Sequence, residues 1–515
     1  MASEDRRWHL GVALAVVFVA VAPYLLAWWL AGEGWVFSGL LYNPRDGYTY
    51  LAKMREGWMG AWRFTLPYTA HPGRGAYLYL FHLALGHLAR WTGLSLPLTY
   101  HLARVLGALV LVWALGRFFA VLFPQQPIAR RFAWLVALFG LGMGWVILPW
   151  AARTPFLPMD LWVAEAYPLL NILTNAHFPW ALALMVFLLT PAEGRWLHGL
   201  AALALALLSP FGVVLTGLIL AVDFAWAYST TASVTPWWDF RRFPPAVRRP
   251  LTRGLWMAVG GVPYTAYTYW VTHHDPVLAA WTSQNYTSLP PWWNVLFGLL
   301  PWAALALVGM WQHGFPGRTR LLVVWAGVSL GLALLPTALQ TRFLMGIYIP
   351  LVGLAVGAAR PRRLWAFALL VLPFSLILTV AYPAKTAFVA RERMLPQYLS
   401  PDEAQAMTWL REHTPPESIV LAAPQTGLLI PAFTGRRVLY GHPMETVEAP
   451  RYRELTGDFF RRCFHGQQAW DFLHREGVDY IFLGPRERAL GGLPIYLPPE
   501  SVVARFGEVV IYRVP

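Results

Sequence analysis

The sequence has little charge, two lysines and a single cysteine. Charged residues make up 13% of the 515-residue chain, about half of the roughly 25% that is usual in soluble proteins, whereas 57% of the residues are hydrophobic. So few polar groups cannot cover so much apolar surface in water, which excludes a soluble globular protein and indicates an integral membrane protein. Because Cys463 is the only cysteine, an intramolecular disulfide, a four-cysteine zinc site and a CxxC redox motif are also excluded.

The net charge of +14 comes almost entirely from arginine, since Lys53 and Lys385 are the only lysines. A chain this basic is a candidate for nucleic-acid binding, but it has no basic stripe with interleaved aromatic residues. The arginines instead form short clusters between apolar runs, as the positive-inside rule predicts for cytoplasmic loops. We therefore expect membrane lipids, and no nucleic acid, among the partners.

Apolar runs of membrane-spanning length follow one another through the first three quarters of the chain. The run at 10–31 follows a short basic N-terminus and lacks a cleavage site, so we interpret it as an uncleaved first span. The run at 197–229 is too long for one span, and Ser209-Pro210 predicts two short helices or one kinked helix there. Further runs lie at 98–116, 132–150, 172–190, 254–272, 292–311, 321–338, 342–359 and 363–383.

Residues 76–95 are apolar enough to span the membrane, but a full span there breaks the alternation of the loops. They also carry His82, His87 and Arg90. We therefore predict a re-entrant or interfacial helix that packs against protein. The chain as a whole is predicted to be an α-helical polytopic membrane protein with about 11–13 transmembrane or re-entrant helices.

The arginine clusters also predict the orientation. If they are cytoplasmic, the N-terminus is cytoplasmic as well, and everything after about residue 384 lies outside. The loops at 33–75, 151–175, 273–291 and 338–342 then lie outside too. We expect a transmembrane domain at 1–383 with a catalytic first outer loop at 33–75, and a bacterial plasma (inner) membrane location, since arginine replaces lysine and disulfides are absent.

From residue 384 to 515 the composition is that of a soluble domain. Ser400-Pro401-Asp402-Glu403 predicts a capping box that begins a helix ending near His413. The pattern then predicts strands at 419–423, 438–440 and 480–483, a helix at 466–476, and a hairpin at 501–514 that turns at Phe506-Gly507. Strands that alternate with helices predict a small extracytoplasmic α/β domain.

The first outer loop is the richest in polar residues. Asp46 comes soon after the first span and beside aromatic residues that include Tyr48, so it is a candidate general base or metal ligand. His71 and Arg74 follow in the same loop and are candidates for holding a phosphate. The alternative for Asp46 is a structural role at the start of the helix that follows.

Later outer loops supply further candidates. Asp160 and Glu165, with His177 at the head of the next apolar run, form a plausible oxygen and nitrogen ligand set, so a divalent cation (Mg²⁺ or Mn²⁺) stays an open alternative. Arg342 lies between two apolar runs with almost no loop, and must face protein, water or an anion such as phosphate, or else snorkel to lipid headgroups. The polar cluster Gly441–Thr446 follows a strand and is interpreted as a strand-to-helix turn.

Several of these features together resemble the GT-C glycosyltransferases, and most closely the bacterial members related to protein O-mannosyltransferases and aminoarabinose transferases. The resemblance covers most of the chain in architecture. The residues that carry it are Asp46-Gly47-Tyr48, His71-Pro72, Asn175-Ala176-His177-Phe178, Ser209-Pro210-Phe211, Arg342-Phe343…Pro350 and Thr434-Gly435-Arg436-Arg437…Gly441-His442.

The resemblance implies an enzyme that moves a sugar from a polyprenyl-phosphate donor to a lipid, glycan or protein acceptor on the outer face, with inversion. By matching position, Asp46 is the catalytic base. Arg342, His71 and Arg74 would stabilise the leaving phosphate, and Tyr48 and His177 would line the donor site. Asp46 is followed by Gly47 where many relatives have a second acid, and the metal carboxylates of the oligosaccharyltransferases have no match, which favours a metal-independent enzyme.

Three alternatives belong to other classes. A lipid or solute transporter (a flippase, for example) would also have many spans, but it would more often show inverted repeats and broken helices in paired positions; the sequence shows a single break, at Ser209-Pro210. An inactive GT-C homologue and a structural membrane scaffold are the other two, and the scaffold leaves the polar first loop unexplained.

Overall fold

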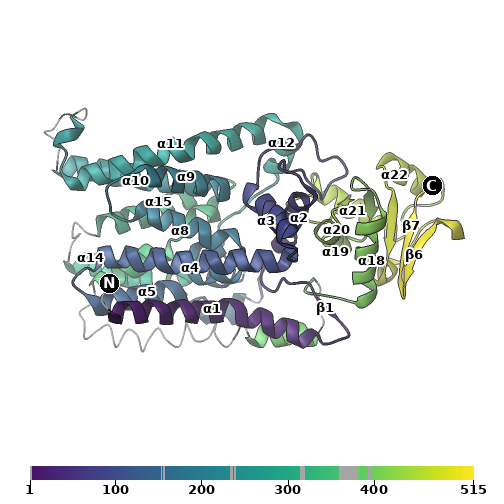
Figure 1. The fold of residues 1–515 in the computed structure, drawn as a ribbon, viewed down its shortest axis with the longest axis horizontal. Helices are drawn as coiled ribbons and strands as arrows, with labels where there is room; N and C mark the ends of the chain where they lie inside the picture. Colours follow the sequence, from purple (N-terminus) through teal and green to yellow (C-terminus); the bar gives the residue numbers. More distant parts are fainter. Residues whose placement is uncertain are drawn as a thin grey trace. The chain divides into compact units, whose positions relative to one another are not determined.

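The computed structural model describes residues 3–151, 153–154, 157–231, 236, 239–313, 319–358, 381, 383–392 and 396–515 (Figure 1). Contacts between residues divide the chain into two compact units, each built from three separate segments. Unit 1 comprises Met1–Ala22, Ala103–Thr268 and Tyr286–Tyr382, and unit 2 comprises Pro23–Leu102, Tyr269–Asn285 and Pro383–Pro515. Unit 2 therefore contains the predicted first outer loop together with the C-terminal segment. The domain boundary near residue 384, which composition alone predicts, stays a prediction.

Five helical segments are long and apolar enough to cross a membrane, judged by length and composition among the described residues. They are Arg6–Ala31, Leu96–Leu122, Pro127–Trp150, Pro210–Thr231 and Gln340–Ala358. A sixth is added if the bent pair α13 (Trp292–Leu299) and α14 (Trp302–His313) counts as one span. The prediction of a polytopic helical membrane protein is thus confirmed, and the predicted span at 363–383 lies almost entirely outside the described residues.

The helices of unit 1 follow the apolar runs of the sequence, in shorter pieces than predicted. Figure 1 shows α8, α9, α10 and α15 alongside one another. Helix α10 contacts each of the other three, and α8 also contacts α9. The elements of unit 1 not yet given are α5 (Pro127–Phe139), α6 (Gly144–Ala151), η1 (Met159–Leu161), η2 (Ala164–Ala166), α7 (Pro168–Leu173), α8 (His177–Leu189), α9 (Trp196–Leu208), α10 (Pro210–Thr231), η3 (Phe240–Arg242), α15 (Arg320–Leu334), η4 (Gln340–Leu344) and α16 (Tyr348–Ala358). Three helices have residues in both units: α1 (Ser3–Ala31), α4 (Leu96–Leu122) and α11 (Pro245–His274).

Prolines explain two of the breaks. The predicted interruption at Ser209-Pro210 is confirmed, because α9 ends at Leu208 and α10 begins at Pro210. The predicted single run at 292–311 is instead two helices that meet at an angle of 73° on either side of Leu300-Pro301. In both places the proline lacks the N–H that a continuous helix needs.

Unit 2 contains a five-stranded sheet in the order β4-β3-β5-β7-β6, in which β4, β3 and β5 are parallel and β5, β7 and β6 are antiparallel. The predicted C-terminal α/β domain is confirmed. Its elements are β2 (Tyr398–Leu399), α18 (Pro401–His413), β3 (Ile419–Leu421), α19 (Pro424–Gly427), α20 (Ile430–Thr434), β4 (Arg437–Val438), α21 (Ala449–Phe460), α22 (Gln467–Arg475), β5 (Tyr480–Leu483), α23 (Pro485–Leu490), η5 (Pro499–Ser501), β6 (Val502–Phe506) and β7 (Val509–Arg513).

The local predictions for this domain hold closely. Ser400 Oγ accepts from Glu403 N, and the Glu403 carboxylate accepts from Ser400 N, which is the predicted capping box at the start of α18. The C-terminal hairpin turns at Gly507, whose φ of 50° lies in the left-handed region that favours glycine. The strands at 419 and 438 are shorter than predicted and end at Leu421 and Val438.

The first loop belongs to the same unit and is itself ordered into β1 (Val36–Phe37), α2 (Pro44–Met59) and α3 (Leu80–Thr92), with α12 (Pro276–Ser283) from the 269–285 segment. Strand β1 pairs with β2, so the first loop and the C-terminal segment share a short sheet. Helices α2 and α3 approach very closely: a Cβ on Gly57 would lie 2.1 Å from Leu83 O, and one on Gly86 would lie 2.0 Å from Met54 O. The 76–95 segment therefore does pack against protein, as its two histidines predict.

Candidate active site

Helix α2 begins two residues before the acid that the sequence singles out. Asn43 at its N-cap has φ 48° in the left-handed region, and Pro44 follows at the first helical position, where its fixed φ suits the helix. Asp46 therefore lies in the first turn, where the helix dipole favours a negative charge. Gly47 leaves room for Leu40, since a Cβ there would lie 2.8 Å from Leu40 Cδ2. This packing is a physical reason for the glycine next to Asp46.

Two nitrogen donors face the Asp46 carboxylate. Asn43 Nδ2 donates to Asp46 Oδ2 at 2.9 Å, and His442 Nε2 lies 3.5 Å from Asp46 Oδ1. The Asp46 side chain is 39% exposed while that of His442 is only 4% exposed. The carboxylate is thus accessible to a substrate but is oriented from the protein side. The 3.5 Å contact is longer than the usual hydrogen bond, so it is a close approach of the two groups.

The imidazole of His442 is held by its own loop, Gly441–Thr446. Met444 N donates to His442 Nδ1 at 3.1 Å, so in the neutral ring the proton is on Nε2, the nitrogen that faces Asp46. Thr446 Oγ1 closes the loop by accepting from Gly441 N and His442 N. The conformation of the loop therefore determines both the tautomer and the direction of the ring.

A buried ion pair joins the same loop to the same helix. Lys53 Nζ donates to Glu445 Oε1 at 2.7 Å, and the Lys53 side chain is 1% exposed. The ammonium also lies 4.3 Å from the ring centroid of Tyr79 and 5.3 Å from that of Phe64, where the ring faces attract a cation. Because burying a charge without a partner is costly, this ion pair holds Glu445 against α2.

The two contacts have a common geometry. Asp46 and Lys53 are seven residues apart, two turns of α2, and therefore lie on one face of that helix. His442 and Glu445 lie in one six-residue loop, so that loop is attached to the helix face at two points. The sequence predicts a strand-to-helix turn for this loop, and Gly441-His442 is one landmark of the resemblance, but no site role is predicted for Lys53, Glu445 or His442. The signals available were the rarity of lysine and the helical spacing from Asp46.

Glu56 is a second carboxylate on α2, and it is almost entirely buried. Its oxygens accept from Thr65 N at 3.3 Å and from Thr65 Oγ1. Burial raises the pKa of Glu56 to about 7, and the hydrogen bonds from Thr65 oppose that rise without cancelling it. Glu56 is therefore close to half protonated at neutral pH.

Replacing Glu56 with glutamine is expected to flatten the pH dependence of stability. The pKa is raised from 4.5 in the unfolded chain to about 7 in the folded protein, so the folded state retains a proton that the unfolded state has lost. The free energy of unfolding of the wild type then falls as the pH rises from about 5 to 7, by up to about 3 kcal/mol, and levels off above. Thermal unfolding at pH 5 and pH 8 measures this, and parallel pH profiles for wild type and Glu56→Gln would contradict it.

The other predicted residues of unit 2 divide into buried and exposed. Tyr48 is buried, its hydroxyl donates to Pro396 O, and its ring lies 6.0 Å from that of Phe433. Burial raises the pKa of the Tyr48 hydroxyl above its ordinary value. His71 and Arg74 are exposed in the loop that precedes α3. Tyr48 thus packs inside unit 2, whereas His71 and Arg74 are exposed, and the substrate contacts of all three stay predictions.

In unit 1 the predicted phosphate ligand Arg342 is ion-paired. Its Nη1 donates to Glu165 Oε1, and its guanidinium lies 5.5 Å from the centroid of the Phe211 ring. Glu165 is also fixed through its backbone, since Gly346 N donates to Glu165 O at 2.8 Å. Arg342 is a quarter exposed, so it has solvent access while its orientation is set by the carboxylate.

Asp160 is bound to backbone rather than presented to solvent. Its Oδ2 accepts from Gly144 N at 3.0 Å, and a Cβ on residue 144 would lie 1.9 Å from Asp160 Oδ1. Burial raises the pKa of Asp160 to about 7 against the effect of those amides. His177 is buried at the first residue of α8, beside the ring of Phe178. The described residues contain no group of three or more His, Cys, Asp or Glu that could hold a metal ion.

These observations define a multi-pass membrane protein whose unit 2 carries a partly exposed acid, with a histidine Nε2 from the C-terminal segment 3.5 Å away. No protein-family model and no curated protein matches the chain in sequence. Solved structures, in contrast, match its fold over most of its length.

Three of these structures are similar at low sequence identity. ArnT from Cupriavidus metallidurans, crystallised with undecaprenyl phosphate, is 15% identical with a TM-score of 0.53, over 100% of this chain and 98% of that one. The oligosaccharyltransferase of Archaeoglobus fulgidus, tethered to an acceptor peptide, is 14% identical with a TM-score of 0.54, over 92% and 69%. The arabinofuranosyltransferase AftD from Mycobacteria is 17% identical with a TM-score of 0.51, over 97% of this chain and 40% of AftD. The chain has the fold of the GT-C glycosyltransferases.

Proposed function

We propose that the chain is a glycosyltransferase that moves a sugar from a polyprenyl-phosphate donor to a hydroxyl-bearing lipid, glycan or protein acceptor, with inversion. The observation that carries this proposal is the Asp46 carboxylate, 39% exposed at the start of α2 and faced by Asn43 and His442. A base must be accessible to its substrate and must also be held in one orientation. Asp46 meets both requirements.

In the proposed reaction Asp46 takes the proton of the acceptor hydroxyl. The acceptor oxygen forms a bond to the anomeric carbon as the bond from that carbon to the phosphate oxygen breaks, and the lipid phosphate leaves with the bonding electrons. His442 keeps its Nε2 proton directed at Asp46 Oδ1 and acts as a positioning residue. Asn43 does the same at Oδ2. The described residues offer no metal ligand set, and no metal-dependent step is proposed.

The departing phosphate gains negative charge, so cations near it lower the barrier. His71 and Arg74 are the exposed candidates in unit 2. Arg342 of unit 1 is a further candidate, and its guanidinium is ion-paired with Glu165. Lipid phosphates are bound by two proteins of the same fold, undecaprenyl phosphate by ArnT and dolichol-phosphate by the archaeal oligosaccharyltransferase AglB.

The proposed setting is a bacterial plasma membrane with the N-terminus in the cytoplasm and the C-terminal domain outside. The arginine clusters of the sequence support this orientation. Accessibility labelling of Cys463, which is exposed and is the only cysteine, measures it directly. Labelling from the cytoplasmic side of sealed vesicles would contradict the orientation.

The function itself is tested with purified protein and polyprenyl-phosphate donors that carry different radiolabelled sugars. We expect donor cleavage with release of polyprenyl phosphate, and stable attachment of the label to an acceptor. Movement of an uncleaved lipid between the leaflets of a vesicle would instead identify a flippase.

A further inference from the structure

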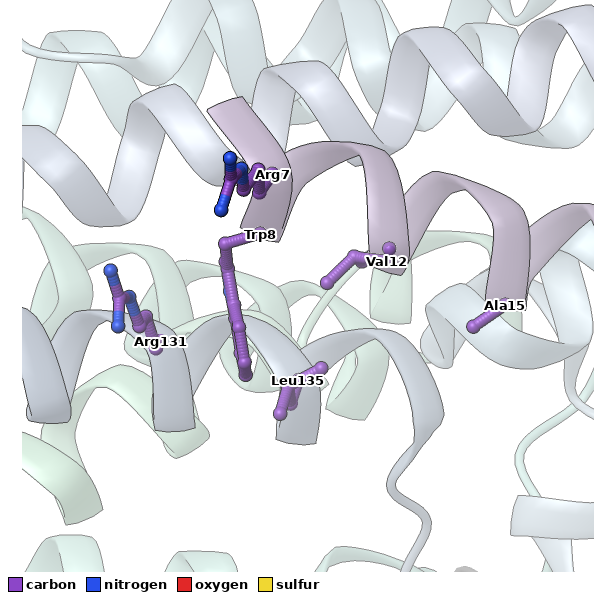
Figure 2. A pocket seen from close by; sticks show the side chains of 7 residues that line it. Arg7, Trp8, Val12, Ala15, Arg131 and Leu135 are labelled. Carbon is purple, nitrogen blue, oxygen red and sulfur yellow. The ribbon is translucent and has the colours of Figure 1, made fainter. Parts of the chain in front are cut away.

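A cleft of about 460 Å³ lies between α1, from Arg7 to Ala15, and α5, from Arg131 to Leu135, entirely within unit 1. Its lining residues are Arg7, Trp8, Gly11, Val12, Ala15, Arg131 and Leu135. Figure 2 shows Arg7 beyond one end of the Trp8 side chain and Arg131 beside the ring, with Val12 and Ala15 further along α1 and Leu135 further along α5. The cleft therefore has one cationic end and one apolar end. This site is separate from Asp46 and from every residue assigned to the proposed reaction.

The shape of the cleft follows from small residues on α1. Gly11 and Ala15 are exposed and four residues apart, so they lie on one face of the helix. A Cβ on Gly11 would meet nothing within 4 Å, which shows open space above that glycine. Leu135 of α5 supplies the facing apolar wall. A hydrocarbon chain suits such a surface, because these residues belong to segments of membrane-spanning length.

The polar end brings two arginines together with an indole N–H. The Arg131 guanidinium lies 5.2 Å from the centroid of the Trp8 ring, a cation–π contact that orients it. The indole Nε1 of Trp8 is buried and has no hydrogen-bond partner among the described residues. Leaving such a donor unsatisfied is costly, so it indicates a missing acceptor. With Arg7, the site offers two guanidinium groups and one indole N–H.

We propose that this cleft binds an anionic membrane phospholipid. Its headgroup phosphate lies between Arg7 and Arg131 and accepts from Trp8 Nε1, and one acyl chain runs along Gly11 and Ala15. A cationic pocket between helices at the polar end of two membrane-length segments has the chemistry that recognises such lipids. Each arginine near a membrane surface contributes about 1 kcal/mol to the attraction of anionic lipid. The bound lipid fills the space between the two helices.

The test is lipid titration of the detergent-purified full chain, with bound lipids counted by native mass spectrometry. We expect dioleoyl phosphatidylglycerol to bind more tightly than dioleoyl phosphatidylcholine. The double variant Arg7→Ala/Arg131→Ala should bind phosphatidylglycerol about 30-fold more weakly, the effect of two such arginines. Gly11→Leu should weaken both lipids, because the added side chain occupies the path of the acyl chain.

The matched control is Arg6→Ala/Arg130→Ala, which removes the same two charges from neighbouring residues that do not line the cleft. It should retain phosphatidylglycerol binding within a few-fold. Equal loss in the control, or equal affinity for the two lipids in the wild type, would overturn the proposal. Tighter binding of undecaprenyl phosphate than of phosphatidylglycerol would also overturn it, since the occupant would then be the carrier lipid of the proposed reaction.

Discussion

Asp46→Asn is expected to lower sugar transfer by about 10²- to 10⁴-fold, the range attributed to a positioned general base. Asparagine keeps the shape of the side chain and still accepts from Asn43 Nδ2 through one oxygen. It cannot take the proton of the acceptor hydroxyl. Binding of the donor should change little, so the loss should appear in kcat rather than in KM. Initial rates with radiolabelled donor at several concentrations separate the two.

Asp458→Asn is the control for this prediction. Asp458 lies on α21 in the same unit, is partly exposed, and pairs with Arg461 at 3.0 Å. Its replacement removes one carboxylate of the same kind at the surface, and transfer should be retained. Wild-type rates for Asp46→Asn would mean that another group is the base, and would remove the basis of the proposed mechanism.

His442 variants examine the positioning role on the same assay. His442→Ala should lower kcat by on the order of 10²-fold, because Asp46 loses one of its two orienting donors. Glutamine carries an amide nitrogen near the position of Nε2, so His442→Gln should recover part of the rate. If both variants are fully folded and have the same low kcat, a hydrogen-bond donor at residue 442 does not account for the loss of rate.

Lys53→Met is expected to destabilise the protein by about 3–5 kcal/mol, the cost of leaving one partner of a buried ion pair without the other. The methionine fits the length of the lysine stem, but Glu445 then has no cation for its buried carboxylate. The double variant Lys53→Met/Glu445→Leu removes both charges and should regain much of the loss. Thermal or denaturant unfolding in detergent measures the wild type, Lys53→Met, Glu445→Leu and the double variant, and the cycle of these four proteins gives the coupling energy.

An exposed pair in the same unit provides the comparison. Arg461 and Asp458 are joined at 3.0 Å with side chains 55% and 32% exposed, and such pairs contribute about 0–1 kcal/mol. Arg461→Met should therefore have little effect on unfolding. If Lys53→Met were equally mild, the Lys53 site would have to be open to water, contrary to its burial.

The parts of this fold that sequence alone predicts are those fixed by near neighbours. The Ser400 capping box needs Glu403 three residues later, and the break at Ser209-Pro210 needs only the proline. The number of long spans is less predictable, since 172–190 is one apolar run but α8 begins at His177. Hydropathy detects apolar residues and does not detect where a short helix ends.

The candidate site is predictable only where it depends on residues that are close in sequence. Asp46 stands out because it is a carboxylate just after an apolar run. Its partner His442 is nearly 400 residues away, and no local pattern in the loop marks an imidazole that faces an acid. Arg342 was predicted as an anion ligand, but its ion pair with Glu165 depends on contacts between distant segments. Pairings of this kind come from the tertiary fold and have no periodicity to detect.

The contact between α2 and the loop of the C-terminal segment also has a consequence for biosynthesis, because its two sides are synthesised at different times. Lys53 and Glu445 are 392 residues apart, and ribosomes add about 5–20 residues per second. Lys53 is therefore synthesised roughly 20–80 s before its carboxylate partner, and Asp46 precedes His442 by a similar interval. A nascent chain can insert its early helices during this time, but its acid has no imidazole beside it. The proposed reaction therefore requires that the last quarter of the chain has been made and has folded back onto the first loop.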